Sequence, residues 1–375
     1  MKPFEFCMPV DVVCGENCVT NNVDIFRSLG KRALVITYDL PAPARHYALE
    51  DVEQVLKEAE IEYVVNKDAI ENPTISSIVK IAKEAMSEGQ VDFIIGCGGG
   101  SAIDSAKVIS LLLKYPDAEP YELLFTEQKI PGVPLVAIPT TCGTGSECTR
   151  WASVTRDDTM NKGSIRIPVF AKYAFVDARY IAELPRSLTC FTALDTLCHC
   201  SEVYLTTGAS FFSKAYGEMG MKLFSTYKDA LLKGEYTKDE RENMMLCATL
   251  GGVAISQAMS ALPHGLSKPV GVTTHMPHGL ACASTLVPYL KIFEDKTEVN
   301  KVVSWCGFKS LEEMDEYMHA MIDEYVARYS CTDADIDAWA QEVFDDKKRL
   351  SVHPGEVTKE MLVGLLNDAY AKIKK

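Results

Sequence analysis

The feature that most constrains the fold is an apolar, strand-like run that passes through glycines into a helix-like run. Residues 91–107 read VDFIIGCGGGSAIDSAK, with a strand expected at Val91–Gly96, glycines up to Gly100 and a helix expected to open at Ser101. Such a turn lets backbone amides approach a phosphate group, whose charge the helix dipole attracts. The spacing departs from the strict dinucleotide fingerprint, so a glycine turn without a ligand remains an alternative for this segment alone.

A second glycine-containing segment follows the next expected strand. Pro139–Glu147 reads PTTCGTGSE and comes directly after the apolar run Leu135–Ile138. It offers two glycines and the hydroxyl groups of Thr140, Thr141 and Thr144. Two turns of this kind, each at the carboxyl end of a strand, favour one common phosphate-binding cleft.

Short β-branched runs alternate with amphipathic runs through the first half of the chain. Strands are expected at Arg32–Thr37 and Glu62–Val65 as well as before the two glycine segments, and helices at Ala48–Ala59 and Ile75–Glu88. This alternation implies a parallel sheet covered by helices. Asp39, at the end of the first strand, is placed to bind an adenosine ribose hydroxyl and so to favour NAD over NADP, although a turn residue before Pro41 is an alternative.

The pattern changes after Leu184-Pro185-Arg186, where long helical patterns replace strands. We therefore expect two domains, 1–187 and 188–375, which also agrees with a length of 375 residues, more than one core usually serves. No internal repeat or low-complexity tract is found. Helices of the second, all-helical domain are expected at Lys222–Lys233, Arg241–Met259, Leu311–Tyr329 and Lys359–Ile373.

Charge and cysteine content limit the partners and the compartment. The formal charge of −14 argues against nucleic acid or an anionic membrane as partner, since both require a basic surface. The first residues show no signal region, and no apolar stretch reaches the length of a bilayer span, so we predict a cytoplasmic protein. Thirteen irregularly spaced cysteines are expected to be reduced and mostly structural. Those beside the motifs are Cys97, Cys142, Cys198 and Cys200.

Three of the seven histidines stand in positions that suggest a metal site. Asp195 and His199 are four residues apart on an expected helix and therefore share a face. His264 and His278 each follow a proline and precede a glycine, as though two breaks in helical structure turned their imidazoles inward. One carboxylate with three imidazoles suits iron(II) or zinc better than calcium or magnesium, which prefer oxygen ligands.

Other interpretations of these residues stay open at this point. An isolated Asp-x-x-x-His pair is commonly a surface pair or a buried, hydrogen-bonded histidine. Cys198 shares the helix face and is a rival ligand. His275 is expected to contact a metal ligand or to lie in a loop, and not to bind the metal itself. The sequence around the remaining histidines, His46, His319 and His353, does not suggest metal binding.

Taken together, these motifs resemble the iron-containing alcohol dehydrogenase family, which is related to glycerol dehydrogenases and dehydroquinate synthases. The resemblance extends over most of the chain. It rests on ENPT at 71–74, GGGSAIDSAK at 98–107, PTTCGTGSE at 139–147, FVD at 175–177, LDTLCHCSEVY at 194–204, and HGLSKPVG with MPHG between 264 and 279.

The resemblance implies a Rossmann-like α/β domain followed by an all-α domain of dehydroquinate synthase-like architecture, with the active site between them and a homodimer or larger homo-oligomer. It implies Fe2+, or alternatively Zn2+, bound by Asp195, His199, His264 and His278. It also implies a nicotinamide cofactor, and Asp39 favours NAD(H) over NADP(H). The residues expected to line the cofactor site are Asp39, Gly98, Gly99, Ser101, Asp104, Thr140, Thr141, Thr144 and Lys162.

The expected reaction is hydride transfer between the nicotinamide and a small primary alcohol or aldehyde whose oxygen the metal polarises. One departure concerns Lys268, which stands where many members have a second histidine four residues after the first. A lysine there can pair with an anionic substrate or a cofactor phosphate, or extend into solvent. It suggests a short anionic aldehyde such as sulfoacetaldehyde or phosphonoacetaldehyde, with butanol, propanediol or glycerol as alternatives.

A second functional hypothesis is a lyase like dehydroquinate synthase, which recycles its NAD internally. Such an enzyme needs several basic residues around a polyanionic substrate, and no such group is evident near 264–278. A nucleotide-binding protein without catalysis is disfavoured because a complete set of metal ligands would then have no purpose.

Overall fold

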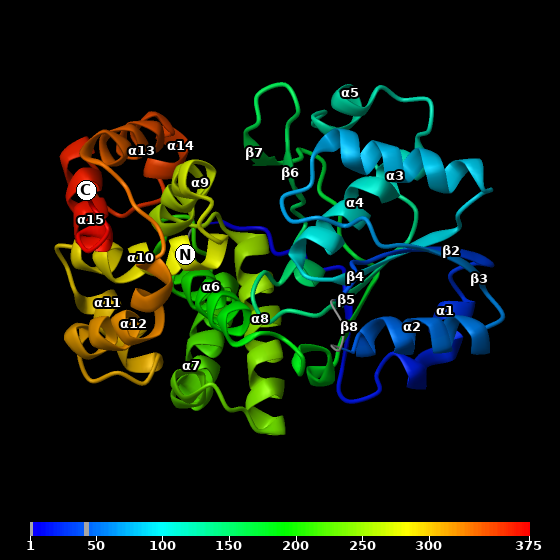
Figure 1. Cartoon of the computed structure of the whole chain (residues 1–375), viewed down its shortest axis with the longest axis horizontal. Helices are drawn as coiled ribbons and strands as arrows, with labels where there is room; N and C mark the ends of the chain where they lie inside the picture. Colours follow the sequence, from blue (N-terminus) through cyan, green and yellow to red (C-terminus); the bar gives the residue numbers. More distant parts are fainter. Residues whose placement is uncertain (1–2, 41–44) are drawn as a thin grey trace. The chain divides into compact units, whose positions relative to one another are not determined.

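A six-stranded parallel sheet forms the centre of the N-terminal half (Figure 1). The computed structural model describes residues 3–40 and 45–375. Its contacts divide the chain into an N-terminal unit, 8–184, and a C-terminal unit, 185–375 with 1–7. The sheet order is β1-β8-β5-β4-β2-β3. The strands are β1 (Asp11–Cys14), β2 (Arg32–Ile36), β3 (Glu62–Asn66), β4 (Phe93–Gly98), β5 (Leu135–Pro139) and β8 (Tyr173–Val176).

Each face of this sheet carries its own hydrophobic core because successive side chains of a strand point to opposite sides. Ala33 and Val35 of β2 belong to one cluster, which the buried face of α2 (Tyr47–Glu58) completes. Leu34 and Ile36 belong to the other, which α3 (Ile75–Ser87) and α4 (Gly100–Lys114) complete. The sheet is therefore covered by helices on both sides.

Smaller elements complete the N-terminal unit. They are the helices α1 (Val23–Arg27) and α5 (Pro120–Leu124), the hairpin of β6 (Ser153–Thr155) with β7 (Lys162–Ser164), and the short 3-10 segments Thr20–Asn22, Ser146–Cys148 and Ala178–Ile181. The sequence patterns did not indicate β1 or the hairpin. Both are short, and a three-residue strand shows too few alternations to be recognised from sequence.

The strand before the first glycine segment ends two residues later than its apolar run suggests. Gly96 lies inside β4, where an added Cβ would meet Ile103 and Ala106 of α4 at 3.0 Å. This glycine thus allows the helix to pack closely on the strand. The helix begins at Gly100, with Gly99 as its N-cap, so the expected opening at Ser101 is one residue late.

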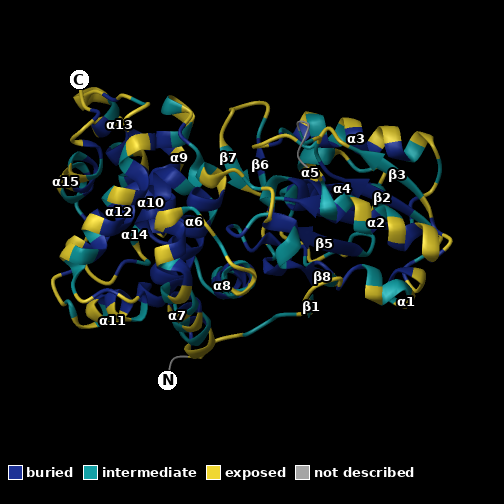
Figure 2. Cartoon of the chain, turned by 60° about the horizontal axis from the view of Figure 1, so that its bottom comes forward, coloured by how far each residue is buried: buried dark blue, intermediate teal, exposed yellow. Residues whose placement is uncertain are grey.

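Ten helices and no strand make up the described part of the C-terminal unit. Two of them, α6 and α10, are buried along most of their length (Figure 2). The helices are α6 (Arg186–Leu205), α7 (Phe211–Lys233), α8 (Lys238–Gln257), α9 (Leu262–Thr274), α10 (His278–Lys291), α11 (Thr297–Trp305), α12 (Leu311–Val326), α13 (Asp333–Asp345), α14 (Lys347–Leu350) and α15 (Lys359–Tyr370).

One expectation for this unit needs correction. Helix α7 begins at Phe211 instead of Lys222, and Ser210 caps it. Gly217 and Gly220 weaken the helical pattern in the sequence, but in the fold they allow close packing against Cys200 of α6. The expected breaks before His264 and His278 are present, since α8 ends at Gln257 and α9 at Thr274, and the proline at each break begins the next helix. Pro263 is in the first turn of α9, and Pro277 is the N-cap of α10.

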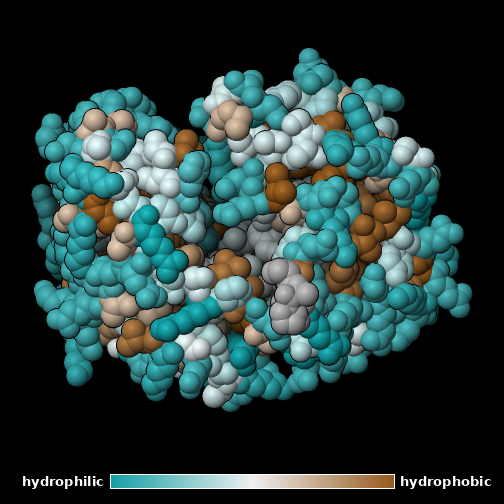
Figure 3. Space-filling model, viewed as in Figure 1, coloured by the Kyte–Doolittle hydropathy of each residue, from teal (hydrophilic) through white to brown (hydrophobic). Residues whose placement is uncertain are grey.

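The visible face of the molecule is mostly hydrophilic (Figure 3). On the face in Figure 3, hydrophilic side chains cover most of the surface and hydrophobic ones form smaller groups. No single helix within residues 3–40 and 45–375 meets the length and hydropathy of a membrane span. The neighbouring helices α8 and α9 meet that criterion only as a pair, and they are bent by 101° relative to each other.

Candidate metal centre and cofactor loops

Three helices of the C-terminal unit bring the four predicted metal ligands together. Asp195 and His199 lie one turn apart on the buried helix α6, His264 is in the first turn of α9, and His278 is the first residue of α10. Asp195, His199 and His264 are buried, and the His278 side chain is 36% exposed. Because one ligand is partly open to solvent, a small molecule can approach the group.

The distances within this group match a metal coordination shell. From Asp195 Oδ1, the Nε2 atoms of the imidazoles lie at 3.4 Å for His264, 3.7 Å for His278 and 3.9 Å for His199. In a tetrahedral shell with bonds of about 2.1 Å, neighbouring ligand atoms are roughly 3.4 Å apart. Each of the three imidazoles therefore lies close enough to Asp195 Oδ1 to share one divalent ion with it.

Buried polar atoms at this point also favour a cation. Asp195 Oδ1 and His264 Nε2 are buried and make no hydrogen bond within the described part of the chain. Burial alone would raise the pKa of Asp195, but the charges of His199 and His278 and the interaction with His264 hold it well below its usual value. Burial would likewise lower the pKa of His264, yet Cys282 and Glu202 raise it well above the ordinary value. The surroundings thus favour a positive charge beside the ionised carboxylate of Asp195. A bound metal ion would supply that positive charge.

A thiol that the sequence analysis did not single out belongs to the same cluster. Asp195, His264, His278 and Cys282 each offer one ligand atom within 4.8 Å of the others. The Cys282 sulfur lies 3.8 Å from His278 Nε2. This group includes neither Cys198, the expected rival ligand, nor the predicted ligand His199, although His199 Nε2 lies 3.9 Å from Asp195 Oδ1. The signal that points to Cys282 is its position four residues after His278, on the same face of α10.

Two further residues hold the outer nitrogens of the imidazoles, and the sequence analysis did not single them out either. His264 Nδ1 lies 2.5 Å from Oε1 of the fully buried Glu202, which is on α6 one turn beyond His199. His278 Nδ1 lies 3.2 Å from the hydroxyl of Ser267. In both imidazoles Nε2 faces Asp195, and a tautomer with the proton on Nδ1, which both oxygens can accept, leaves the lone pair on Nε2.

The remaining histidines lie elsewhere and have other roles. His275 ends α9 in a left-handed conformation, with a φ of 59°. His46 caps α2, with Nδ1 accepting from the backbone of Leu49 and Nε2 2.9 Å from the Thr37 hydroxyl. His319 pairs with Asp315 and Asp323, and His353 is buried beside aromatic rings. None of the four belongs to the ligand cluster found among the described residues.

Lys268 lies on α9, four residues after His264, and is exposed. Residues four apart share a helix face, so the lysine stem rises from the same side of α9 as the imidazole.

In the N-terminal unit, the two glycine segments lie side by side because β4 and β5 are neighbours in the sheet. Gly98 pairs with Pro139 in the parallel register, and the backbone amide of Thr140 donates to the carbonyl of Gly98 at 3.0 Å. The Thr140 hydroxyl lies 2.7 Å from that of Tyr38, which follows β2 on the other side of β4. Three strand ends thus meet at one edge of the sheet.

The glycines allow these segments to touch. An added Cβ at Gly98 would lie 2.7 Å from Ala102 and 2.9 Å from the Tyr38 ring. At Gly99 it would lie 3.1 Å from Thr141, and at Gly100 2.6 Å from Thr144. The absence of side chains at 98–100 therefore brings the threonine hydroxyls next to the N-terminus of α4, where the first backbone amides of a helix have no partner within it.

Asp104 and Lys107 of α4 fix the second segment to the first. Asp104 accepts hydrogen bonds from the Ser146 hydroxyl at 2.5 Å and from the Ser153 amide at 2.8 Å. The fully buried Lys107 ammonium donates to Ser146, Thr149 and the carbonyl of Trp151. Burial lowers the pKa of Lys107, and the nearby Asp104 and Glu147 oppose that shift. Both Asp104 carboxylate oxygens are thus engaged within the protein, in a network that holds the two segments together.

The last two residues expected in the cofactor site pair with protein groups near the surface. Asp39 follows β2, is 74% exposed and forms an ion pair with Lys67 at 2.8 Å. Lys162 of β7 donates to the side-chain carbonyl of Asn72 at 2.7 Å. Ser101 lies in the first turn of α4 and is partly exposed.

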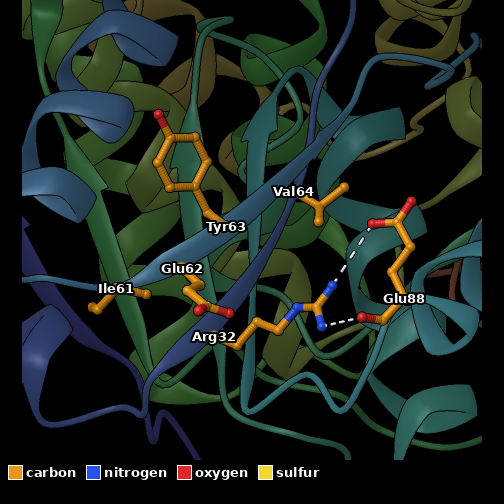
Figure 4. Close-up of a pocket in the computed structure, with 6 residues that line it drawn as sticks. All are labelled: Arg32, Ile61, Glu62, Tyr63, Val64 and Glu88. Carbon is orange, nitrogen blue, oxygen red and sulfur yellow. Dashed lines mark hydrogen bonds and ion pairs between the residues drawn. The ribbon is translucent and has the colours of Figure 1, made fainter.

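A separate pocket in this unit lies at the opposite ends of the strands. Figure 4 shows it lined by Arg32, the residues 61–64 and Glu88. Arg32 begins β2, and its guanidinium contacts both the carboxylate, at 3.7 Å, and the backbone carbonyl of Glu88. The pocket is thus at the amino end of the sheet and does not include the glycine segments.

Comparison with known proteins gives relatives along the whole chain. The model of iron-containing alcohol dehydrogenase matches residues 9–178, and the model of the C-terminal part of the Fe-containing alcohol dehydrogenase family matches residues 189–370. Alcohol dehydrogenase 4 of Saccharomyces cerevisiae is 28% identical over 384 aligned residues, which cover 97% of this chain and 98% of the yeast protein. The 4-hydroxybutyrate dehydrogenase of Clostridium kluyveri is 30% identical over 76% of this chain and 80% of its own length.

The bifunctional aldehyde-alcohol dehydrogenase AdhE of Escherichia coli is 34% identical over 68% of this chain. The alignment spans only 30% of the bifunctional protein.

Solved structures share the complete fold. An iron-containing alcohol dehydrogenase from Thermotoga maritima superimposes with a TM-score of 0.88 at 30% identity, covering 98% of this chain and all of the other. A sulfoacetaldehyde reductase from Bifidobacterium kashiwanohense, in complex with NAD+, has a TM-score of 0.85 at 22% identity, covering 99% and 100%. These comparisons confirm the predicted fold class, the resemblance and the expected oxidoreductase class. The chain belongs to the iron-containing alcohol dehydrogenase family.

Proposed function

We propose that this protein transfers a hydride between a nicotinamide dinucleotide and a small primary alcohol or aldehyde, with one divalent metal ion as cofactor. The observation that carries the proposal is the convergence of Asp195 Oδ1 with three imidazole Nε2 atoms at 3.4–3.9 Å. Family membership supports the reaction type.

The metal ion would be held by Asp195, His264 and His278 together with His199, whose Nε2 lies 3.9 Å from Asp195 Oδ1, and Cys282 is an additional neighbouring donor. When bound, it would supply Lewis-acid polarisation of the substrate oxygen. The chain contributes a buried carboxylate that balances part of the ion's charge and three imidazoles that direct their lone pairs to one point. Imidazole with carboxylate suits Fe2+ or Zn2+, and we propose Fe2+ as the native ion in line with the family.

The dinucleotide would be bound by the two glycine segments of the N-terminal unit. Backbone amides at the start of α4 would receive its pyrophosphate, and the hydroxyls of Thr140, Thr141 and Thr144 lie beside them. We propose NAD(H) over NADP(H), because the exposed carboxylate of Asp39 follows β2 at the same edge of the sheet and would repel a 2′-phosphate. Lys162 is proposed as a further cofactor contact. Asp104 instead has a proposed structural role, because its hydrogen bonds to Ser146 and Ser153 hold the second glycine segment against α4.

We propose a substrate that carries an acidic group, such as a short ω-carboxylate, sulfonate or phosphonate aldehyde. The exposed Lys268, one turn beyond His264, would pair with that group. One relative is named 4-hydroxybutyrate dehydrogenase, and 4-hydroxybutyrate is an alcohol that carries a carboxylate, which supports this class of substrate. Uncharged aldehydes such as butanal are the alternative.

A panel of aldehydes with NADH and NADPH tests the proposal on protein loaded separately with Fe2+ and Zn2+. We expect stoichiometric NADH consumption with a short anionic aldehyde, at a kcat/KM about fivefold above that of butanal, because one exposed charge pair contributes up to about 1 kcal/mol. Lys268→Ala should remove this preference, while Lys222→Ala, an exposed lysine of α7, should leave it unchanged. Turnover without net NADH change would instead indicate a lyase of the dehydroquinate synthase type, and activity of metal-free protein would contradict the proposal.

The exposed surface of the protein bears on its assembly. We propose a homodimer or larger homo-oligomer, and the exposed side chains Phe4, Phe211 and Phe212 are the first candidates for its interface. Sedimentation of the wild-type chain and of Phe211→Ser tests this, with a shift to monomer expected for the variant.

A cytoplasmic location is supported by the thirteen cysteines, all described and none in a disulfide.

A further inference from the structure

Glu202 is a fully buried carboxylate that touches the metal group without belonging to it. It lies on α6, one turn after His199 and two turns after Asp195, on the face of the helix that carries both. A buried carboxylate is unfavourable unless each oxygen has a partner. The partners of its two oxygens therefore indicate its role.

One oxygen completes the N-terminus of α9. Ala261, the N-cap of that helix, has no side-chain oxygen to accept from the first turn. Glu202, which belongs to α6, provides the missing acceptor. Its Oε2 atom accepts hydrogen bonds from the backbone amides of Ala261 at 2.7 Å and His264 at 3.4 Å. A negative charge at this end of a helix is also favoured by the helix dipole.

The other oxygen binds the imidazole of a candidate ligand. Oε1 lies 2.5 Å from His264 Nδ1, and the opposite ring nitrogen, Nε2, lies 3.4 Å from Asp195. When Nδ1 donates its proton to the carboxylate, Nε2 carries the lone pair that a metal ion needs. The same carboxylate thus fixes the backbone and the ring of His264 at once.

From this geometry we infer that Glu202 is a positioning residue of the metal centre. It holds His264 in the tautomer and orientation that bind the ion, and it places a second negative charge behind the ligand, so that Asp195 and Glu202 together balance a divalent cation. Ser267 holds His278 Nδ1 in the same way but without charge, at 3.2 Å. The inference rests on the proposed function, since it assumes that an ion binds between these residues.

Glu202→Gln tests the inference because it keeps the size of the side chain and removes its charge. A glutamine has one acceptor oxygen, so its amide nitrogen must face a donor at Ala261 or at His264. Loss of such an outer partner typically weakens metal binding about 10- to 100-fold. We therefore expect the Kd for Zn2+, measured by chelator competition on the full chain, to rise by this factor. The visible absorption of the Co2+-loaded variant should also change, because the ring orientation of one ligand changes.

Two matched variants separate positioning from simple stability. Thr237→Ala removes the capping box of α8, which is exposed and distant in sequence from the ligands, so it should lower the melting temperature of the metal-free chain without changing the Kd or the Co2+ spectrum. Ser267→Ala should raise the Kd less than Glu202→Gln does, since only a neutral hydrogen bond is lost.

The outcomes distinguish the inference from the proposed function. A Glu202→Gln chain that binds Zn2+ as tightly as wild type, with an unchanged Co2+ spectrum, would reduce Glu202 to a helix cap and overturn the inference alone. A wild-type chain that binds neither Zn2+ nor Co2+ would overturn the proposed function as well.

Discussion

The cofactor segments of the N-terminal unit and the metal centre of the C-terminal unit are built in opposite ways. The first uses backbone and small side chains: residues 98–101 and 139–147 meet because two neighbouring strands end side by side and glycines remove the obstacles. The second uses long polar side chains from three helices, with ligand candidates between Asp195 and Cys282.

Because of this difference, the two regions should be sensitive to different kinds of substitution. In the glycine segments, close packing depends on the absence of side chains at 98–100, so an added methyl group should be harmful. In the metal centre, function depends on the sign of buried charge, because a carboxylate and several imidazoles are out of water and need a cation or a proton. Substitutions should therefore damage one region through volume and the other through charge.

The largest effect is expected when charge is removed from the metal centre. Asp195→Asn keeps the shape of the side chain but loses the anion that all three imidazoles face. Several kcal/mol of transition-state stabilisation should be lost, about three orders of magnitude or more in kcat/KM. Metal content, measured by elemental analysis, should fall with activity while NADH affinity stays the same. Asp229→Asn, an exposed residue of α7, is the control, and a metal-free but active Asp195→Asn enzyme would contradict the assignment.

The next effect concerns Lys107, a buried charge beside the glycine segments. Lys107→Met removes the ammonium that binds Ser146, Thr149 and the carbonyl of Trp151, and leaves Asp104 without its cation. Breaking such a buried pair costs about 3–5 kcal/mol in the free energy of unfolding. Hydrogen exchange of the β4 and β5 amides measures the loss. Lys114→Met, at the exposed end of α4, should leave exchange unchanged, and equal rates in both variants would refute the structural role of Lys107.

A smaller effect is expected from added volume at the first glycine segment. Gly98→Ala places a methyl group 2.7 Å from Ala102 and 2.9 Å from Tyr38, which forces the segments apart. Overpacking of this kind costs about 1–3 kcal/mol, so the Kd for NADH should rise about tenfold or more. Metal content should not change. Gly163→Ala, in β7 with open space around it, should bind NADH like wild type, and equal affinity in Gly98→Ala would sink the proposed binding site.

The smallest effect concerns the choice between the two nicotinamide cofactors. Asp39→Ala removes the exposed carboxylate and releases Lys67, whose ammonium can then meet a 2′-phosphate. An exposed pair contributes up to about 1 kcal/mol, so the ratio of kcat/KM for NADPH to that for NADH should rise about fivefold. The double variant with Lys67→Ala should lose part of this gain. An unchanged ratio would remove Asp39 from the cofactor site.

By itself, the sequence determined what short-range patterns can encode. Alternating β-branched and amphipathic runs predicted a parallel sheet, because strand and helix periods are local properties. The glycine segments were found for the same reason. The four proposed ligands could be named from a helical spacing, from two Pro-His-Gly contexts and from family resemblance, and that resemblance and the fold class are confirmed.

Only the tertiary structure decided which distant side chains share one point in space. Nothing local marks Glu202 as the partner of His264, 62 residues later, or Ser267 as the partner of His278. The helix spacing could have indicated Cys282, but not its approach to Asp195 on another helix. Conversely, Asp104 was expected to contact the cofactor, and its hydrogen bonds to Ser146 of the second segment and to Ser153 of β6 became visible only in the fold. Contacts of this kind depend on how helices and strands pack against each other, and packing is a property of the whole chain rather than of any short window.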